Sequence, residues 1–195
     1  MKEKAKNFLY IILAIVISFF IYRFLTIRLL DFLPFVIENK IPLYISVILI
    51  QSIIIYILLK AIINNELNKS SIIMLSIQYF LILAFLLFGR TIGLKGIELN
   101  IFNSFKDWFD DSYSLIVSIA NILMFVPMGF FFKDKNKKIS IFIMLFCIIT
   151  CEGIQYIFSL GFFDIGDIVL NLIGFIIGIT FFKSEFFKNK IILKN

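Results

Sequence analysis

Six long apolar stretches are the feature that most constrains this sequence. They cover, in chain order, about 8–27, 41–63, 71–88, 112–132, 139–158 and 165–182. Each is close to the roughly 20 residues that a helix needs to cross a bilayer. With 61% hydrophobic and only 16% charged residues, the chain could not cover its apolar side chains with a polar surface. The sequence therefore predicts an all-α fold, a polytopic membrane bundle of about six transmembrane helices, and excludes a water-soluble globule.

The distribution of basic residues predicts which side of the membrane each connection occupies. About two thirds of the 19 lysine and arginine residues lie before the first stretch, between alternate stretches and after the last one. The positive-inside rule then places both termini of a multi-pass protein in the cytoplasm. The composition, rich in isoleucine, lysine, asparagine and phenylalanine, fits an A/T-rich bacterial genome, so the expected location is the bacterial cytoplasmic membrane. The basic first residues, with no cleavage site after the apolar run, predict an uncleaved signal anchor. Because the lysines flank spans, the net charge of +6 indicates membrane orientation and no nucleic-acid partner.

Histidine is absent, and the two cysteines are four residues apart. The absence excludes histidine bases, Ser-His-Asp triads and histidine-ligated zinc. Cys147 and Cys151 share one face of an apolar helix, which indicates packing and not a disulfide framework. We therefore expect no cofactor and no metal site.

The longest connection, 89–111, is predicted to lie on the outer side of the membrane. Phe102, Phe105 and Phe109 recur there at helical spacing beside Trp108, which favours a short amphipathic helix in the outer interface. The alternative is a loop with scattered aromatic residues. No internal repeat or disordered linker interrupts the chain, so one membrane domain over 1–195 is the simplest organisation.

Polar side chains inside three of the apolar stretches require an explanation, because an acid at the centre of a span costs about 2.5–3.5 kcal/mol. Glu152 and Gln155 share a face of the fifth stretch, and Asn121 lies on a polar face of the fourth. The sixth stretch carries a polar and small stripe at steps of three and four. Its members are Asp164, Asp167, Asn171, Gly174 and Gly178.

Small residues and a proline predict how these stretches pack. Gly174 and Gly178 form a small-xxx-small surface that permits close approach of another helix. Pro127 removes a backbone donor in the fourth stretch and leaves the carbonyl group of Leu123 without its usual partner, which favours a kink just before Gly129.

Given the predicted orientation, the polar groups of four segments fall in the outer half of the membrane. Arg90 ends the third stretch at that level and is the expected counter-charge for the carboxylates. We therefore predict a water-accessible pocket in the outer leaflet. Two alternatives stay open: the amides bridge helices only, and Asp164 lies in a solvated turn. The predicted ligand-binding set is Arg90, Asn121, Glu152, Gln155, Asp164, Asp167 and Asn171.

An ordered series of motifs resembles the VanZ-like family of membrane proteins. Residues 121–129 are similar to its N-x-L-x-F-x-P-x-G signature, 152–155 to its E-x-x-Q, and 163–174 to its F-D-I-x-D-x-x-x-N-x-x-G. Arg90, Asn100 and Ser104 resemble a preceding R…N-L-x-P-F region, with serine in place of proline. The family usually has an arginine where this chain has Gly161. The resemblance covers about 85–182 and divides the domain into a two-helix extension, 1–70, and a VanZ-like region, 71–195.

The resemblance implies lowered sensitivity to teicoplanin, a glycopeptide antibiotic. On this interpretation the polar pocket binds or handles a cell-wall precursor, an envelope lipid or a lipoglycopeptide, and the other partner is the bilayer. Two alternatives stay open. Paired carboxylates suit a membrane-embedded hydrolase or transferase that acts on an envelope lipid or peptide, with or without a divalent cation. Buried acids also permit a proton-coupled transporter, although the chain shows no repeated halves with broken helices.

Overall fold

The computed structural model describes residues 2–27, 40–64, 66–89, 93–102, 112–190 and 192–194. Six helical segments in this part are long and apolar enough to cross a membrane, at Ala5–Phe24, Ile41–Asn64, Lys69–Phe88, Ser114–Phe131, Lys137–Ile157 and Ile165–Lys183. The six predicted spans are confirmed. Helices are the expected result, because in lipid every backbone polar group has to be satisfied within the chain.

The chain divides into two compact units. The first unit contains residues 1–82 and 189–195 and the second contains 83–188. In the first, α1 (Lys2–Ile21) continues into the π-helix η1 (Tyr22–Thr26) and packs on α3 (Lys40–Asn64). The Ser18 hydroxyl group donates to the Ile48 carbonyl oxygen at 2.9 Å, which fixes this pair of helices.

Two short strands complete the first unit together with most of α4 (Lys69–Phe88). Strand β1 (Glu66–Asn68) pairs in parallel with β4 (Ile192–Lys194), so the backbone beyond α10 (Glu185–Lys190) returns to the α3–α4 connection. The Asn68 side chain accepts a hydrogen bond from the Ser71 amide at 2.9 Å and thereby caps the start of α4.

The second unit is built around α9 (Ile165–Lys183), which packs against α6 (Ser112–Phe125), α7 (Met128–Phe131) and α8 (Lys137–Ile157). Its core contains side chains that are almost fully buried. They are Met144, Ile148, Leu170, Phe175 and Ile179. The opposite face of α8 carries Phe142 and Phe146, both about 70% exposed, which suits a surface in contact with lipid.

Backbone capping explains where these helices begin and end. The Asn136 side chain accepts from the amides of Lys138 and Ile139 and starts α8. The Asp164 side chain does the same for α9 through the Gly166 amide, at 2.7 Å. Pro127 separates α6 from α7, and the Leu123 carbonyl oxygen there accepts from the Val126 amide at 3.3 Å in a tighter turn.

Glycine allows the α6–α7 segment and α9 to pack at backbone contact. A Cβ atom added at Gly174 would meet the backbone of Ile122, and one added at Gly178 would meet that of Val126. Gly129 stands in the same relation to the backbone of Gly178 and Ile179. The small surface expected at Gly174 and Gly178 is therefore the face that contacts α6.

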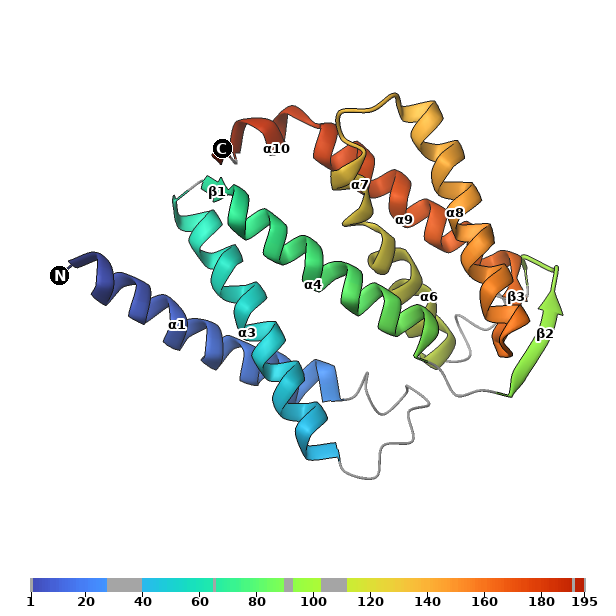
Figure 1. Ribbon diagram of the computed structural model, residues 1–195, viewed down its shortest axis with the longest axis horizontal. Helices are drawn as coiled ribbons and strands as arrows, with labels where there is room; N and C mark the ends of the chain where they lie inside the picture. The colour runs from blue at the N-terminus through green and yellow to red at the C-terminus, as the bar shows by residue number, and fades with distance from the viewer. Residues whose placement is uncertain are drawn as a thin grey trace. The chain divides into compact units, whose positions relative to one another are not determined.

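A small parallel sheet joins two connections of the second unit. Strand β2 (Leu94–Glu98) follows α4, and β3 (Leu160–Asp164) links α8 to α9. The two pair in register from Leu94–Leu160 to Glu98–Asp164, and Figure 1 shows them beside the ends of α8 and α9. The amphipathic helix predicted around 99–109 lies largely outside the described residues, while 94–98 form the strand.

Candidate functional site

Asn121 and Asp167 form the central polar contact between α6 and α9. The Asn121 Nδ2 atom donates to Asp167 Oδ1 at 2.6 Å. Asn121 is 5% exposed and Asp167 is half-buried. A short hydrogen bond to a carboxylate is of the strong, charge-assisted kind. The polar stripe predicted in the sixth apolar stretch therefore faces Asn121, the polar side chain predicted in the fourth.

Glu152 and Gln155 continue the buried face of α8. Both are 2% exposed and follow Ile148 at steps of four and three residues, so they point into the second unit. The Gln155 Nε2 atom donates to the backbone oxygen of Leu87 at 2.9 Å, which ties α8 to the end of α4. Gln155 thus bridges helices, while Glu152 places a carboxyl group inside the same packed face.

Asn171 lies one helical turn beyond Asp167 on α9. Its side chain is 2% exposed, and Oδ1 has no hydrogen-bond partner among the residues that the structure describes. The flanking positions on this face are Asp167, bonded to α6, and Gly174, against the backbone of α6. Asn171 therefore belongs to the face of α9 that packs toward α6.

Asp164 has a different local role from the one its spacing indicated. It precedes α9 in an extended conformation and caps the helix, so it is not the first member of a helical stripe. Arg90, the predicted counter-charge, lies outside the described residues, and its role stays a prediction. The convergence of Glu152 and Asp167 in a pocket likewise stays a prediction.

Glu98 is a candidate that the sequence analysis missed. The register of β2 and β3 places it opposite Asp164, and neighbouring strands lie about 4.8 Å apart. Its Oε1 atom accepts from the Asn100 amide at 2.9 Å. On the same strand, Lys95 Nζ lies 4.8 Å from the centre of the Tyr156 ring. No periodicity in so short a segment signals a partner more than 60 residues away.

In the part of the chain that the structure describes, carboxylate and amide side chains come together, as Asp167 and Asn121 do. The same residues do not form a metal site. No group of three acidic or cysteine side chains in the described ranges is arranged to hold one ion. Carboxylates accept hydrogen bonds only, whereas amides both donate and accept, so the combination suits hydroxyl and amine groups of a ligand.

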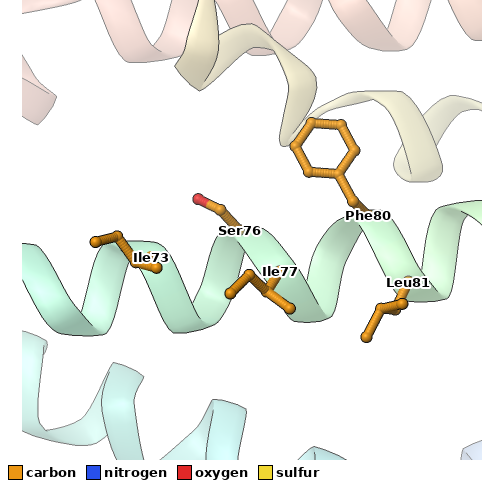
Figure 2. Close-up of a pocket in the computed structure, with 5 residues that line it drawn as sticks. All are labelled: Ile73, Ser76, Ile77, Phe80 and Leu81. Atoms are coloured by element: carbon orange, nitrogen blue, oxygen red, sulfur yellow. The ribbon is translucent and has the colours of Figure 1, made fainter.

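An open, shallow pocket lies elsewhere, along α4 in the first unit. It has a volume of about 400 Å³ and is lined by Ile73, Ser76, Ile77, Phe80 and Leu81. Figure 2 shows these side chains along successive turns of α4. None of them is a predicted site residue, and the largely apolar lining suits contact with lipid chains.

A double-mutant cycle measures the contact between α6 and α9. We expect Asn121→Ala and Asp167→Ala to be coupled by about 0.6 kcal/mol, with an upper bound near 1.7 kcal/mol, as for other hydrogen bonds between membrane helices. Unfolding of the two single variants and the double variant in detergent gives this energy. Strictly additive losses would contradict a direct Asn121–Asp167 bond.

Comparison with known proteins finds a related family for the second unit and for the part of α4 that precedes it. The sequence model of the VanZ/LLP1 family matches residues 71–188. Protein VanZ of Enterococcus faecium is 31% identical over 68 residues, which cover 33% of this chain and 42% of that protein. The chain thus matches less than half the length of this curated relative. No solved structure matches the chain.

Proposed function

Since this chain belongs to the VanZ/LLP1 family, we propose that it lowers sensitivity to teicoplanin-type glycopeptides by binding a component of the cell envelope. It is a multi-pass membrane protein, and we place it in the bacterial cytoplasmic membrane. The proposed site is the polar cluster. We define this cluster as Arg90, Asn121, Glu152, Gln155, Asp164, Asp167 and Asn171.

The part-buried Asn121–Asp167 bond is the observation that carries the proposal. Both residues lie in apolar spans and in the region matched by the family. Acidic side chains inside spans are costly and mark sites that bind or move polar molecules. Glu152 adds a second carboxyl group on the buried face of the neighbouring helix α8.

The positions of the cluster along the helices support an envelope ligand. Gln155 and Glu152 lie in the last two turns of α8, and Asp164 and Asp167 lie at the start of α9. The lysines in the segments 133–138 and 183–188 lie at the opposite ends of these two helices. The positive-inside rule puts those lysines in the cytoplasm, so the cluster belongs to the outer half of the membrane.

The chemistry of the cluster defines the ligand class that we propose. Cell-wall precursors and lipoglycopeptides carry many hydroxyl, amide and amine groups, which pair with carboxylates and side-chain amides. Such a ligand would enter from the outer leaflet and leave its apolar part among lipid chains. Arg90 would balance the carboxylates or bind an acidic group of the ligand.

Expression in a susceptible bacterium tests this function. The wild-type chain is expected to raise the minimal inhibitory concentration of teicoplanin several-fold and that of vancomycin less. Glu152→Gln and Asp167→Asn keep side-chain size but remove charge, and each should abolish the teicoplanin effect. Ser18→Ala is the matched control, since it removes a buried hydrogen bond of the first unit, outside the matched region.

Unchanged teicoplanin sensitivity in both charge variants, at equal amounts of protein in the membrane, would contradict the role of the cluster. Loss of the effect in Ser18→Ala as well would trace it to folding and not to the cluster. No effect of the wild-type chain itself would contradict the resistance function.

The pairing of Glu98 with Asp164 favours a second candidate, a carboxylate-based hydrolase or transferase. A hydrolase or transferase of this kind needs one carboxyl group as general acid and another as general base, and the strand register places two acidic residues at paired positions. Turnover of an envelope lipid or peptide by the purified protein, abolished by Glu98→Gln and by Asp164→Asn, is the expected result for this candidate. Binding without turnover would favour the first.

A further inference from the structure

Lysine side chains gather where α8 begins and α9 ends, at the opposite end of these helices from the polar cluster. The Lys137 Nζ atom donates to the Thr180 hydroxyl oxygen at 2.9 Å. Lys183 Nζ donates to the backbone oxygen of Lys135. These two contacts join the start of α8, and the connection just before it, to the last turn of α9. We call this surface the basic end, consisting of Lys133, Lys135, Lys137, Lys138 and Lys183.

The basic end carries an excess of positive charge that its own acids do not balance. Its five lysines are accompanied by Asp134 and Glu185 in the segments 133–138 and 183–187. Lys135, Lys137 and Lys138 are exposed. Lys137 and Lys138 are the first two residues of α8, where a positive charge interacts unfavourably with the helix dipole. The arrangement is therefore unfavourable within the chain itself and favours an anion at the surface.

The ammonium groups, and not the helix terminus, are the groups that an anion would meet. The Asn136 side chain already accepts from the Lys138 amide at 3.0 Å and from the Ile139 amide at 3.3 Å. Two of the first backbone donors of α8 are thus occupied. Lys135 and Lys138 extend exposed side chains on either side of this cap.

Exposed aromatic side chains adjoin the lysines. Phe131, Phe181 and Phe186 are 38%, 45% and 62% exposed. Lys133 Nζ lies 4.1 Å from the centre of the Phe130 ring, and the Phe130 ring packs 5.5 Å from that of Phe182. Apolar rings beside ammonium groups are typical of a membrane–water interface, where rings contact acyl chains and cations reach the headgroups.

We propose that the basic end binds the headgroup of an anionic phospholipid. Lysines grouped next to a transmembrane helix attract anionic lipids through the surface potential and by direct contact with phosphate. The exposed phenylalanines favour a lipid over a soluble phosphate, because their exposed surface can contact acyl chains while the lysines reach the headgroup. This site is distinct from the polar cluster: Glu152 lies 15 residues along α8 from Lys137, about 22 Å.

Native mass spectrometry of the full chain in detergent tests the proposal, with phosphatidylglycerol and phosphatidylcholine as probes. We expect the wild type to bind phosphatidylglycerol about tenfold more tightly. The variant Lys135→Gln/Lys137→Gln/Lys138→Gln should lose most of this preference. The matched control, Lys2→Gln/Lys4→Gln/Lys6→Gln, removes the same charge from the start of α1 and should keep it.

Several results would overturn the proposal. One is an equal loss in the two triple variants, which would indicate a general effect of charge. Another is equal binding of the two lipids by the wild type. A third is displacement of phosphatidylglycerol by millimolar inorganic phosphate, which would indicate a soluble anion as the ligand. Lys138→Gln alone changes one exposed side chain, so a partial loss in it supports the site even if the triple variant folds poorly.

Discussion

Gly178→Ala is expected to lower the free energy of unfolding by about 2–3 kcal/mol, the cost of inserting a methyl group where there is no space. The added Cβ atom would overlap the backbone oxygen of Val126, which has no rotamer by which to move away. The α6–α7 segment and α9 would have to separate along their whole contact. Unfolding of the purified protein in detergent, followed by circular dichroism during an SDS titration, measures the loss.

Gly153→Ala is the matched control for this prediction. Gly153 is also a glycine inside a long helix, but a Cβ atom added there meets nothing within 4 Å. Removing the flexibility of glycine should leave stability unchanged or raise it by about 0.5–1 kcal/mol. An equal loss in both variants, or none in Gly178→Ala, would contradict the close approach of the helices.

Phe175→Ala is expected to cost about 2–3 kcal/mol, somewhat less than the 3–5 kcal/mol of a water-soluble core. The Phe175 ring is 0% exposed and meets the Phe132 ring edge to face at 5.4 Å. In a membrane the reference environment is itself apolar, so the loss comes mainly from the cavity and the contacts that it removes. The same SDS titration measures it.

Ile173→Ala serves as the control for the core substitution. This side chain lies on the same helix, but 39% of it is exposed on the face away from the packed core. Its removal should cost well under 1 kcal/mol, because lipid can fill the space. A comparable loss in both variants would mean that α9 is not packed on the face described above.

The spans and much of the polar cluster follow from simple patterns in the sequence. Length and hydropathy predict the six helices, and steps of three and four put Asp167, Asn171 and Gly174 on one face of α9. The bond from Asn121 to Asp167 joins two such faces. Helical periodicity therefore predicts which side chains turn inward, since lipid leaves few other ways to accommodate them.

Other features depend on contacts that no local pattern encodes. The pairing of β2 with β3 brings Glu98 to Asp164, although neither segment has the length or alternation that signals a strand. Asp164 fits the spacing of the α9 stripe, yet the residue before a helix is better used as a cap. Spacing alone does not distinguish the first turn of a helix from its cap.

The central position of α9 has a consequence for biosynthesis. Of the six spans, α9 has the largest buried share, 44%, and it packs on α6, α7 and α8, which precede it in the chain. During insertion these earlier helices leave the ribosome before their common neighbour exists. Until α9 is inserted, Asn121 lies in lipid or at the translocon without its hydrogen bond to Asp167. Nascent chains stalled before residue 165 should consequently be the preferred targets of membrane quality-control proteases.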